Sequence, residues 1–320
     1  MKYMSRIVGT LVLAAGLAAC EPIDDGGGGG GGGNVLFTKG FAFVRGDDRN
    51  IYVVDDQGDP SSPKRLTTAG GTSHPSVSRN GRTIVFVQQT GTTFELRTVP
   101  TDGSAQPSTV LTSGTGCSGC TNFRYPTFNP AANVIVFAFN RGSGNFSLGK
   151  VNADGSGFQA LTNNPATSYG APSFYPDGQS VLVPAGNNST SLTGLERVTL
   201  TGVPSTITNN LGQEALGVLN RAAVSPDGQK VALDGRLGNG SSRIFVAPLS
   251  PFSTPVRVTD HSGTDASAQD TFPSWMNAGQ VGFTSTAGGG QSIYRINISG
   301  TPLPGTLLIP TASEPSYGGQ

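Results

Sequence analysis

The stretch Pro172-Ser-Phe-Tyr-Pro-Asp-Gly178, followed by Ser180-Val-Leu-Val183, decides the fold because variants of it return along the chain. A repeat with a period of 20 to 50 residues sets the architecture of a whole chain, so it is examined before any other feature. The other copies are Pro75-Ser-Val-Ser-Arg-Asn-Gly81 with Thr83–Val87, Pro126-Thr-Phe-Asn-Pro130 with Val134–Phe137, Ala222-Ala-Val-Ser-Pro-Asp-Gly228 with Lys230–Leu233, and Pro273-Ser-Trp-Met-Asn277 with Gln280–Phe283.

Each copy has the composition of a small antiparallel sheet. Asp-Gly and Asn-Gly pairs allow the positive φ of a tight hairpin turn, and the flanking runs are rich in the β-branched and aromatic residues that strands favour. A third apolar strand follows each copy, and most then have a short strand ending in Leu-Thr or Val-Thr. The copies begin at positions 75, 126, 172, 222 and 273, which are 51, 46, 50 and 51 residues apart. This spacing predicts four-stranded propeller blades rather than the shorter repeats of a solenoid.

The repeat resembles that of the TolB β-propeller. The shared pattern is Pro-x-hydrophobic-Ser-Pro-Asp-Gly, then Val/Ile-x-Phe, Ile-Tyr-Val and Leu-Thr, and it extends over about residues 41–317. The best matches are Pro172–Gly178 and Val224–Gly228 for the first strand, and Asn50–Val53 and Ser292–Tyr294 for the third strand.

Two copies depart from the pattern, with Asn129-Pro-Ala131 and Asn277-Ala-Gly279 in place of Pro-Asp-Gly. We expect no counterpart of the separate N-terminal α/β domain of TolB in this sequence, because glycines occupy its place. The resemblance therefore implies an all-β propeller fold, and it does not transfer the role of TolB itself.

The sequence predicts six blades and a ring closed by the C-terminal strand. Phe41–Val44, Asn50–Val54 and Arg65–Thr67 have the pattern of the last three strands of a blade that lacks its first strand. At the other end of the chain, Glu314–Tyr317 repeats the Pro-Ser opening of a first strand. We therefore expect residues 314–317 to lie beside Phe41–Val44, which completes the blade and removes an open sheet edge.

Composition excludes several classes of protein. The 320 residues include 20 Lys plus Arg and 20 Asp plus Glu, so the formal net charge is zero. We expect no nucleic-acid partner, because neutralising phosphates requires a basic excess. The 47 glycines and 22 prolines argue against a helical fold. The sequence has no Cys or His cluster with zinc spacing, so we predict no metal and no other cofactor.

The first twenty residues resemble a bacterial lipoprotein signal. Lys2 and Arg6 are followed by the apolar segment Ile7–Ala19, which is shorter than the roughly 20 residues that a membrane-spanning helix needs. The segment closes with Leu17-Ala-Ala-Cys20, which is similar to the lipobox, in which the cysteine is acylated and becomes the first mature residue. The alternative is an ordinary signal peptide with an incidental cysteine. We favour the lipobox, in which the acyl chains hold the protein firmly to the membrane.

This interpretation divides the chain into three parts. Residues 1–19 are the predicted signal peptide, and residues 20–33 contain the lipidated Cys20 and a tether that includes eight consecutive glycines at Gly26–Gly33. Glycine loses the most backbone entropy on folding, so the tether is predicted to be flexible. Residues 34–320 are the predicted propeller. Glu21 follows the cysteine, where the enterobacterial sorting rule has Asp for inner-membrane retention, so we expect the outer membrane of the cell envelope, on its periplasmic side or at the surface.

The residues that precede the prolines of the first strands form a candidate binding site. First strands line the central channel of a propeller, so these residues are expected to form a ring at the channel mouth. The alternative, which we favour, is that they are ordinary strand-entry residues. The candidate ring consists of His74, Tyr125, Arg221, Phe272 and Glu314, with Ala171 at the same position of the remaining blade.

Two loops carry further candidate residues. Cys117 and Cys120 lie in a long loop, and we predict a structural disulfide between them, because paired thiols of exported proteins are usually oxidised. Metal binding would need a second pair of cysteines, and a thioredoxin-like site would need an α/β fold. His261 lies in the polar loop Asp260–Asp270, close to Asp265 and Asp270. Acidic loops can hold calcium, but the spacing does not match the calcium-loop motif, so we predict a solvated loop.

Two functions remain open at the level of sequence. The first is a monomeric, non-enzymatic binding or scaffold module that is anchored by its lipid and offers a loop face to an envelope protein or a peptidoglycan-associated partner. The second is a lyase or hydrolase that acts on carbohydrate or peptide at the channel mouth. We favour the first, because the sequence has no Gly-x-Ser-x-Gly elbow and a single sequence cannot pair two carboxylates across a cleft.

Overall fold

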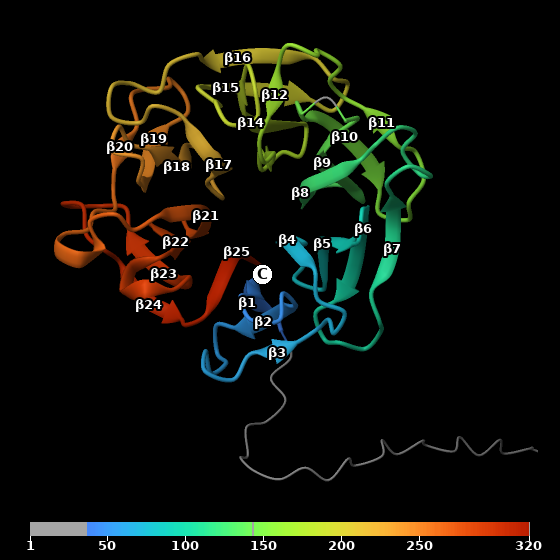
Figure 1. Ribbon diagram of the computed structural model, residues 1–320, viewed down its shortest axis with the longest axis horizontal. Helices are drawn as coiled ribbons and strands as arrows, with labels where there is room; N and C mark the ends of the chain where they lie inside the picture. The colour runs from blue at the N-terminus through green and yellow to red at the C-terminus, as the bar shows by residue number, and fades with distance from the viewer. Residues whose placement is uncertain (1–36, 143, 320) are drawn as a thin grey trace, which may run out of the picture. The chain divides into compact units, whose positions relative to one another are not determined.

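The computed structural model describes residues 37–142 and 144–319, which form six antiparallel sheets arranged in a ring (Figure 1). The prediction of an all-β, six-bladed propeller is confirmed. Two short 3₁₀ turns, η1 (Gly263–Asp265) and η2 (Ala287–Gly289), are the helical elements of the described part of the chain. No helix within the described ranges has the length and hydropathy that crossing a membrane requires.

Each blade begins at the central channel and ends at the rim. Blade 1 contains β25 (Ala312–Gly319), β1 (Lys39–Arg45), β2 (Ile51–Asp55) and β3 (Lys64–Arg65); blade 2 contains β4 (Thr72–Val77), β5 (Thr83–Thr90), β6 (Thr93–Pro100) and β7 (Ser108–Thr112); blade 3 contains β8 (Asn122–Phe128), β9 (Val134–Asn140), β10 (Ser147–Asn152) and β11 (Gln159–Ala160). Blade 4 contains β12 (Ser168–Tyr169), β13 (Ser173–Phe174), β14 (Ser180–Gly186), β15 (Gly194–Thr199) and β16 (Pro204–Thr208); blade 5 contains β17 (Val218–Val224), β18 (Lys230–Arg236), β19 (Ser242–Pro248) and β20 (Val256–Arg257); blade 6 contains β21 (Asp270–Asn277), β22 (Gln280–Ser285), β23 (Ser292–Asn297) and β24 (Thr306–Ile309).

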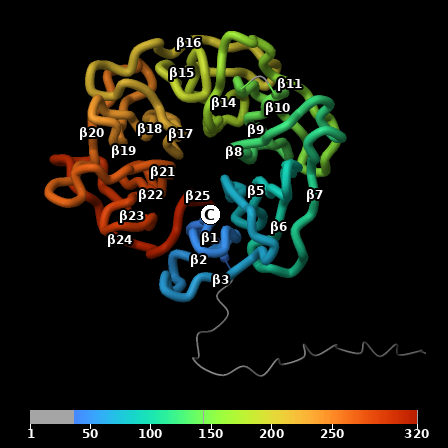
Figure 2. Tube along the Cα trace, in the orientation of Figure 1, coloured from blue at the N-terminus to red at the C-terminus, as the bar shows by residue number. Residues whose placement is uncertain are grey.

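The C-terminal strand closes the ring as predicted. In Figure 2 the red β25 lies beside the blue β1 near the centre of the molecule. The two strands are antiparallel, with Phe41 opposite Tyr317 and Ala42 opposite Ser316. The ring of Tyr317 packs edge-on against Phe41 with the centroids 4.9 Å apart. Both ends of the described chain therefore belong to one sheet, and β1 is paired on both of its edges.

The hydrophobic core lies between blades rather than inside one central cluster. Side chains alternate between the two faces of a strand, and in β1 this alternation sends Phe41 and Phe43 toward blade 6 and Ala42 and Val44 toward blade 2. Six clusters of this kind fill the six interfaces between neighbouring blades. Both faces of the second strands are thus buried, which explains continuous apolar runs such as Ile84–Val87.

Blade 4 differs from the prediction at its first strand. Four strands are expected, but the channel-side strand is divided into β12 and β13 on either side of Pro172, so the sheet has five strands. Proline has no N–H for the ladder, and the N–H of Ala171 donates instead to the carbonyl of Asn220 in blade 5 at 3.2 Å. A backbone hydrogen bond therefore joins the first strand of blade 4 to blade 5 at this point.

Candidate functional site

The five residues of the candidate ring come together inside the channel. The ring centroid of His74 lies 4.2 Å from that of Tyr125 and 6.2 Å from that of Phe272. The guanidinium carbon of Arg221 lies 5.8 Å from the centroid of Phe272. The Oε2 atom of Glu314 accepts the backbone N–H of His74 at 2.5 Å. These side chains come from five blades and form one contiguous cluster, which we call the channel plug.

The plug residues lie within their strands rather than at strand entries, which corrects the interpretation favoured from the sequence. Each first strand begins two or more residues earlier, because its pairing continues across a register shift at the plug position. The backbone there is left-handed, with φ of 54° to 55° at His74, Tyr125, Phe272 and Glu314. Bulky residues seldom adopt this conformation. Its recurrence in four blades at one level of the channel marks a bulge that turns these side chains toward the axis.

Buried hydrogen bonds hold the plug in place. The carboxylate of Asp234, on β18, accepts the backbone N–H groups of Asn220, Arg221 and Phe272 at 2.8 to 3.0 Å. Burial raises the pKa of Asp234, while these donors lower it. Burial also lowers the pKa of His74 to about 4 and raises that of Tyr125 to about 12. His74 is therefore a neutral imidazole at pH 7.

A cavity of about 530 Å³ lies on the side of the plug where the first and second strands are joined by their turns. Tyr125, Ala171 and Arg221 line its inner end, while His74, Phe272 and Glu314 are not among its lining residues. All six blades contribute to its walls. The plug therefore forms the floor of this cavity. Part of the predicted ring faces the cavity, and the rest packs behind the floor.

The walls carry hydroxyl groups that reasoning from the sequence missed. The hydroxyl residue lies two positions after the plug residue in five blades, and Ala223 takes its place in blade 5. The oxygen of Ser316 accepts the N–H of Val77 at 3.1 Å, and the oxygen of Ser173 accepts that of Val224 at 3.0 Å. The members that line the cavity are Ser76, Thr127, Ser173, Ser274 and Ser316. Their signal was visible as the Pro-Ser or Pro-Thr pair of each copy, but it was assigned to the fold alone.

At blade 5, where Ala223 stands in place of the hydroxyl residue, a tryptophan of blade 6 makes the contact between the two blades. The indole N–H of Trp275 donates to the carbonyl of Ala223 at 2.8 Å. Trp275 lines the cavity, has an exposed fraction of 6%, and is the single tryptophan of the chain. It therefore links blades 5 and 6 and places one indole against the cavity.

The charged residues that line the cavity are all positive. Arg79 and Arg221 are the charged residues among the described lining, which includes no Asp, Glu or His. Arg79 is exposed on the turn between β4 and β5, whereas Arg221 lies at the floor. Burial lowers the pKa of Arg221, and the carboxylates of Asp234 and Glu314 raise it. The arrangement suits a ligand that carries negative charge or many hydrogen-bond acceptors.

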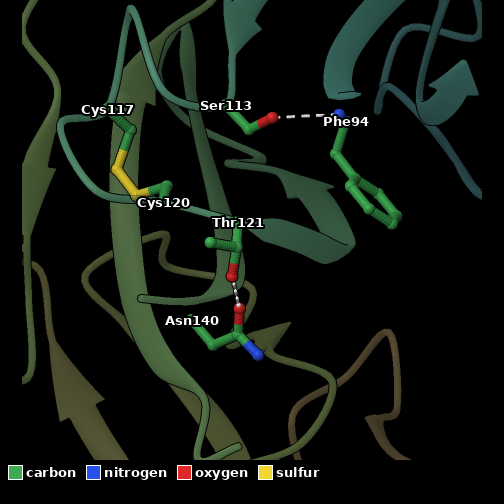
Figure 3. The surroundings of a disulfide bond; sticks show 6 residues. All are labelled: Phe94, Ser113, Cys117, Cys120, Thr121 and Asn140. Atoms are coloured by element: carbon green, nitrogen blue, oxygen red, sulfur yellow. Dashed lines mark hydrogen bonds between the residues drawn. A yellow bond between two sulfur atoms is a disulfide. The ribbon is translucent and has the colours of Figure 1, made fainter. Parts of the chain in front are cut away.

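The loop between blades 2 and 3 contains a disulfide between Cys117 and Cys120, as predicted (Figure 3). Both cysteines are buried and belong to the core between these blades. The loop is bordered by two hydrogen bonds, from the Phe94 N–H to the Ser113 hydroxyl at 3.0 Å and from the Thr121 hydroxyl to the Asn140 side-chain oxygen at 2.6 Å. Its position at the core indicates a structural role for the bridge.

The loop around His261 is not the solvated loop predicted from the sequence. The side chains of His261 and Asp270 are 1% and 0% exposed, and His261 Nε2 lies 2.9 Å from Asp270 Oδ1. Arg243 anchors the same loop by donating to the carbonyls of Ala266 and Ala268 at 2.8 and 2.6 Å. The short-range sequence pattern missed this because Arg243 lies on β19, outside the loop. Within the described residues, no group of three or more His, Cys, Asp or Glu side chains is arranged to hold a metal ion.

Comparison with known proteins supports the fold. No protein-family model matches the chain, and no curated protein matches it. Among solved structures, TolB from Acinetobacter baumannii has a TM-score of 0.63 at 14% identity over 89% of this chain and 67% of that protein. A putative TolB from Agrobacterium tumefaciens has a TM-score of 0.55 at 15% identity over 82% and 86% of the two chains.

An enzyme has the same architecture. Oligogalacturonate lyase from Vibrio parahaemolyticus has a TM-score of 0.53 at 14% identity over 82% of this chain and 78% of that one. At these identities the likeness establishes a TolB-like propeller fold and leaves the function to the site. The predicted lipidation site, Cys20, lies outside the described residues.

Proposed function

We propose that this protein is a non-enzymatic binding module whose channel cavity receives a segment of a partner protein. The observation that carries this proposal is the cavity itself, which has the channel plug at one end and is open beside the turns at the other. Its walls combine proline and aromatic side chains with hydroxyl groups. Apolar walls with a few convergent polar groups are typical of ligand sites, and a pocket of this size accommodates several residues of an extended chain.

The chemistry of the lining favours binding over turnover. Glycoside hydrolysis needs a pair of carboxylic groups on either side of the scissile bond, and general acid–base catalysis needs a group that titrates near the working pH. The described lining offers arginines, hydroxyls and two tyrosines, Tyr125 and Tyr317, whose pKa values are raised by burial. A second, enzymatic function has no observation of its own in its favour.

The proposal places the propeller in the bacterial cell envelope. Cys20 would carry the lipid, and residues 21–33 would form the flexible tether that lets the cavity face turn toward a partner. Thirteen residues of such a chain have a root-mean-square reach of about 20 Å. A tethered monomer of this kind would search the space close to the membrane, where the partner would be an envelope protein or a peptidoglycan-associated protein.

Site-specific photo-crosslinking in living cells tests this proposal. A photo-reactive residue at position 127 lies on the cavity wall, and one at position 206 lies on the exposed outer strand β16 as a matched control. We expect a discrete protein adduct from Thr127 that is absent from Thr206. Adducts that are equal at both positions, or turnover of an oligosaccharide that is lost in Arg221→Gln, would overturn the proposal.

A further inference from the structure

We infer that the channel cavity is selective for a carboxylate, which the partner segment presents to Arg221 at the floor. The inference deepens the proposed function and rests on it. The carboxylate can come from the C-terminus of the partner or from an Asp or Glu side chain within it, and the chemistry of recognition is the same for both sources.

Arg221 is fixed in place and still has donors to offer. One terminal nitrogen, Nη1, donates to the carbonyl of Pro315 at 3.1 Å. The guanidinium also rests near the face of Phe272. Its Nε and Nη2 groups have no hydrogen-bond partner among the described residues, and they are not among the fully buried unpaired atoms. A guanidinium held in this way can bind a carboxylate through two parallel hydrogen bonds.

The charged side chains that line the cavity are both positive. Behind the floor lie the carboxylates of Asp234 and Glu314, each already occupied by backbone N–H groups. Arg221, Arg124 and Arg49 all act on the plug, since the positive charge of each lowers the pKa of His74. Arg221 lines the cavity at the floor and Arg79 adds a second positive charge at the open end, whereas no carboxylate belongs to the described lining.

The wall hydroxyls add donors of the right kind. A serine hydroxyl has one proton to donate and two lone pairs that accept. In Ser173, Ser274 and Ser316 the oxygen already accepts a backbone N–H from the next blade. That N–H fixes the oxygen beside the cavity and leaves the hydroxyl proton available for a ligand acceptor. Neutral donors and arginines together favour an acceptor-rich anion over a cation or an amine.

The single tryptophan provides the experiment. Uniformly ¹⁵N-labelled protein gives one indole cross-peak, from Trp275 on the cavity wall. The probes are acetyl-(Gly-Ala)₃ with a free carboxyl end, the same peptide with an amide end, and the amide-ended peptide with Glu as its last residue. We expect a saturable shift of the indole peak with both acidic peptides, and binding at least tenfold weaker for the neutral one.

Variants identify the group responsible. Arg221→Gln should remove the preference for the acidic peptides, while Arg236→Gln, which removes an equal charge from an exposed position outside the lining, should keep it. Raising the salt concentration should weaken binding of the acidic peptides. Equal binding of acidic and neutral peptides would overturn the carboxylate selectivity and leave the binding function standing. If all three peptides leave the indole peak unmoved, the carboxylate site is wrong, and the crosslinking experiment still decides the proposed function.

Discussion

Replacing Ser316 with Ala should destabilise the propeller measurably, because it removes a hydrogen bond between blade 1 and blade 2. The hydroxyl oxygen of Ser316 accepts the N–H of Val77 at 3.1 Å and thereby joins β25 of blade 1 to β4 of blade 2. Ser316 has an exposed fraction of 8%. Alanine keeps the backbone and most of the packing, so the dominant change is one N–H that loses its acceptor between two blades.

The size of the effect follows from the cost of an unpaired donor. Leaving a buried polar group unsatisfied costs about 1–3 kcal/mol. Val77 is half-buried, so water partly replaces the lost acceptor, and we expect a loss of about 1–2 kcal/mol. For a domain somewhat larger than 250 residues this corresponds to a fall in Tm of roughly 2–3 °C.

Urea unfolding monitored by the fluorescence of Trp275 gives the free energy of unfolding. Ser76→Ala is the matched control, since Ser76 occupies the same position in blade 2 and lines the same cavity, but its hydroxyl makes no hydrogen bond within the described residues. We expect Ser76→Ala to lie within about 0.5 kcal/mol of the wild type. If the two variants unfold at the same urea concentration, the hydroxyl of Ser316 does not join the blades in the way that the structure indicates.

Three further predictions address other parts of the molecule. Burial lowers the pKa of His74 to about 4 from 6.5, so the unfolded state takes up a proton at a higher pH than the folded state. The free energy of unfolding should therefore fall as the pH drops from about 6.5 to about 4. His74→Asn should flatten this fall, because asparagine does not titrate there and tolerates the left-handed backbone. Cys20→Ser should move the protein from the membrane fraction to the soluble fraction, and equal sedimentation of variant and wild type would contradict the lipid anchor. The peptide that spans Cys117 and Cys120 should gain the mass of two hydrogens on reduction, whereas free thiols in protein isolated from the envelope would contradict the bridge.

The local pattern was sufficient to predict the blades and their closure. The turn after Ser225 shows why: the N–H of Gly228 donates to the carbonyl of Ser225 at 2.8 Å, and the glycine has a φ of 72°, so the Pro-Asp-Gly signature encodes the turn within four residues. The lone first-strand signature at Glu314–Tyr317 likewise had one unfilled place to occupy.

The site depends on residues from different blades, and the sequence says little about such contacts. Asp234 stands out as a charged residue in an apolar strand, but its donors lie on two other strands and cannot be found from its neighbours in the chain. The left-handed bulge at the plug could not be predicted either, because the residue before a proline ordinarily favours an extended backbone. The burial of His261 was missed for a similar reason, since Arg243 anchors its loop from another strand, β19.

The affinity of the crosslinked partner for two tryptophan variants tests the central claim most directly. Thr127→Trp places an indole on the cavity wall, and Thr206→Trp places the same side chain on the exposed rim strand. Purified propeller is titrated calorimetrically with the identified partner. Binding should be at least 100-fold weaker for Thr127→Trp, a loss of about 2.7 kcal/mol of binding free energy, because the indole fills the cavity. For Thr206→Trp the affinity should lie within about twofold of the wild type. Unchanged affinity in a folded Thr127→Trp variant would mean that the partner does not enter the channel cavity.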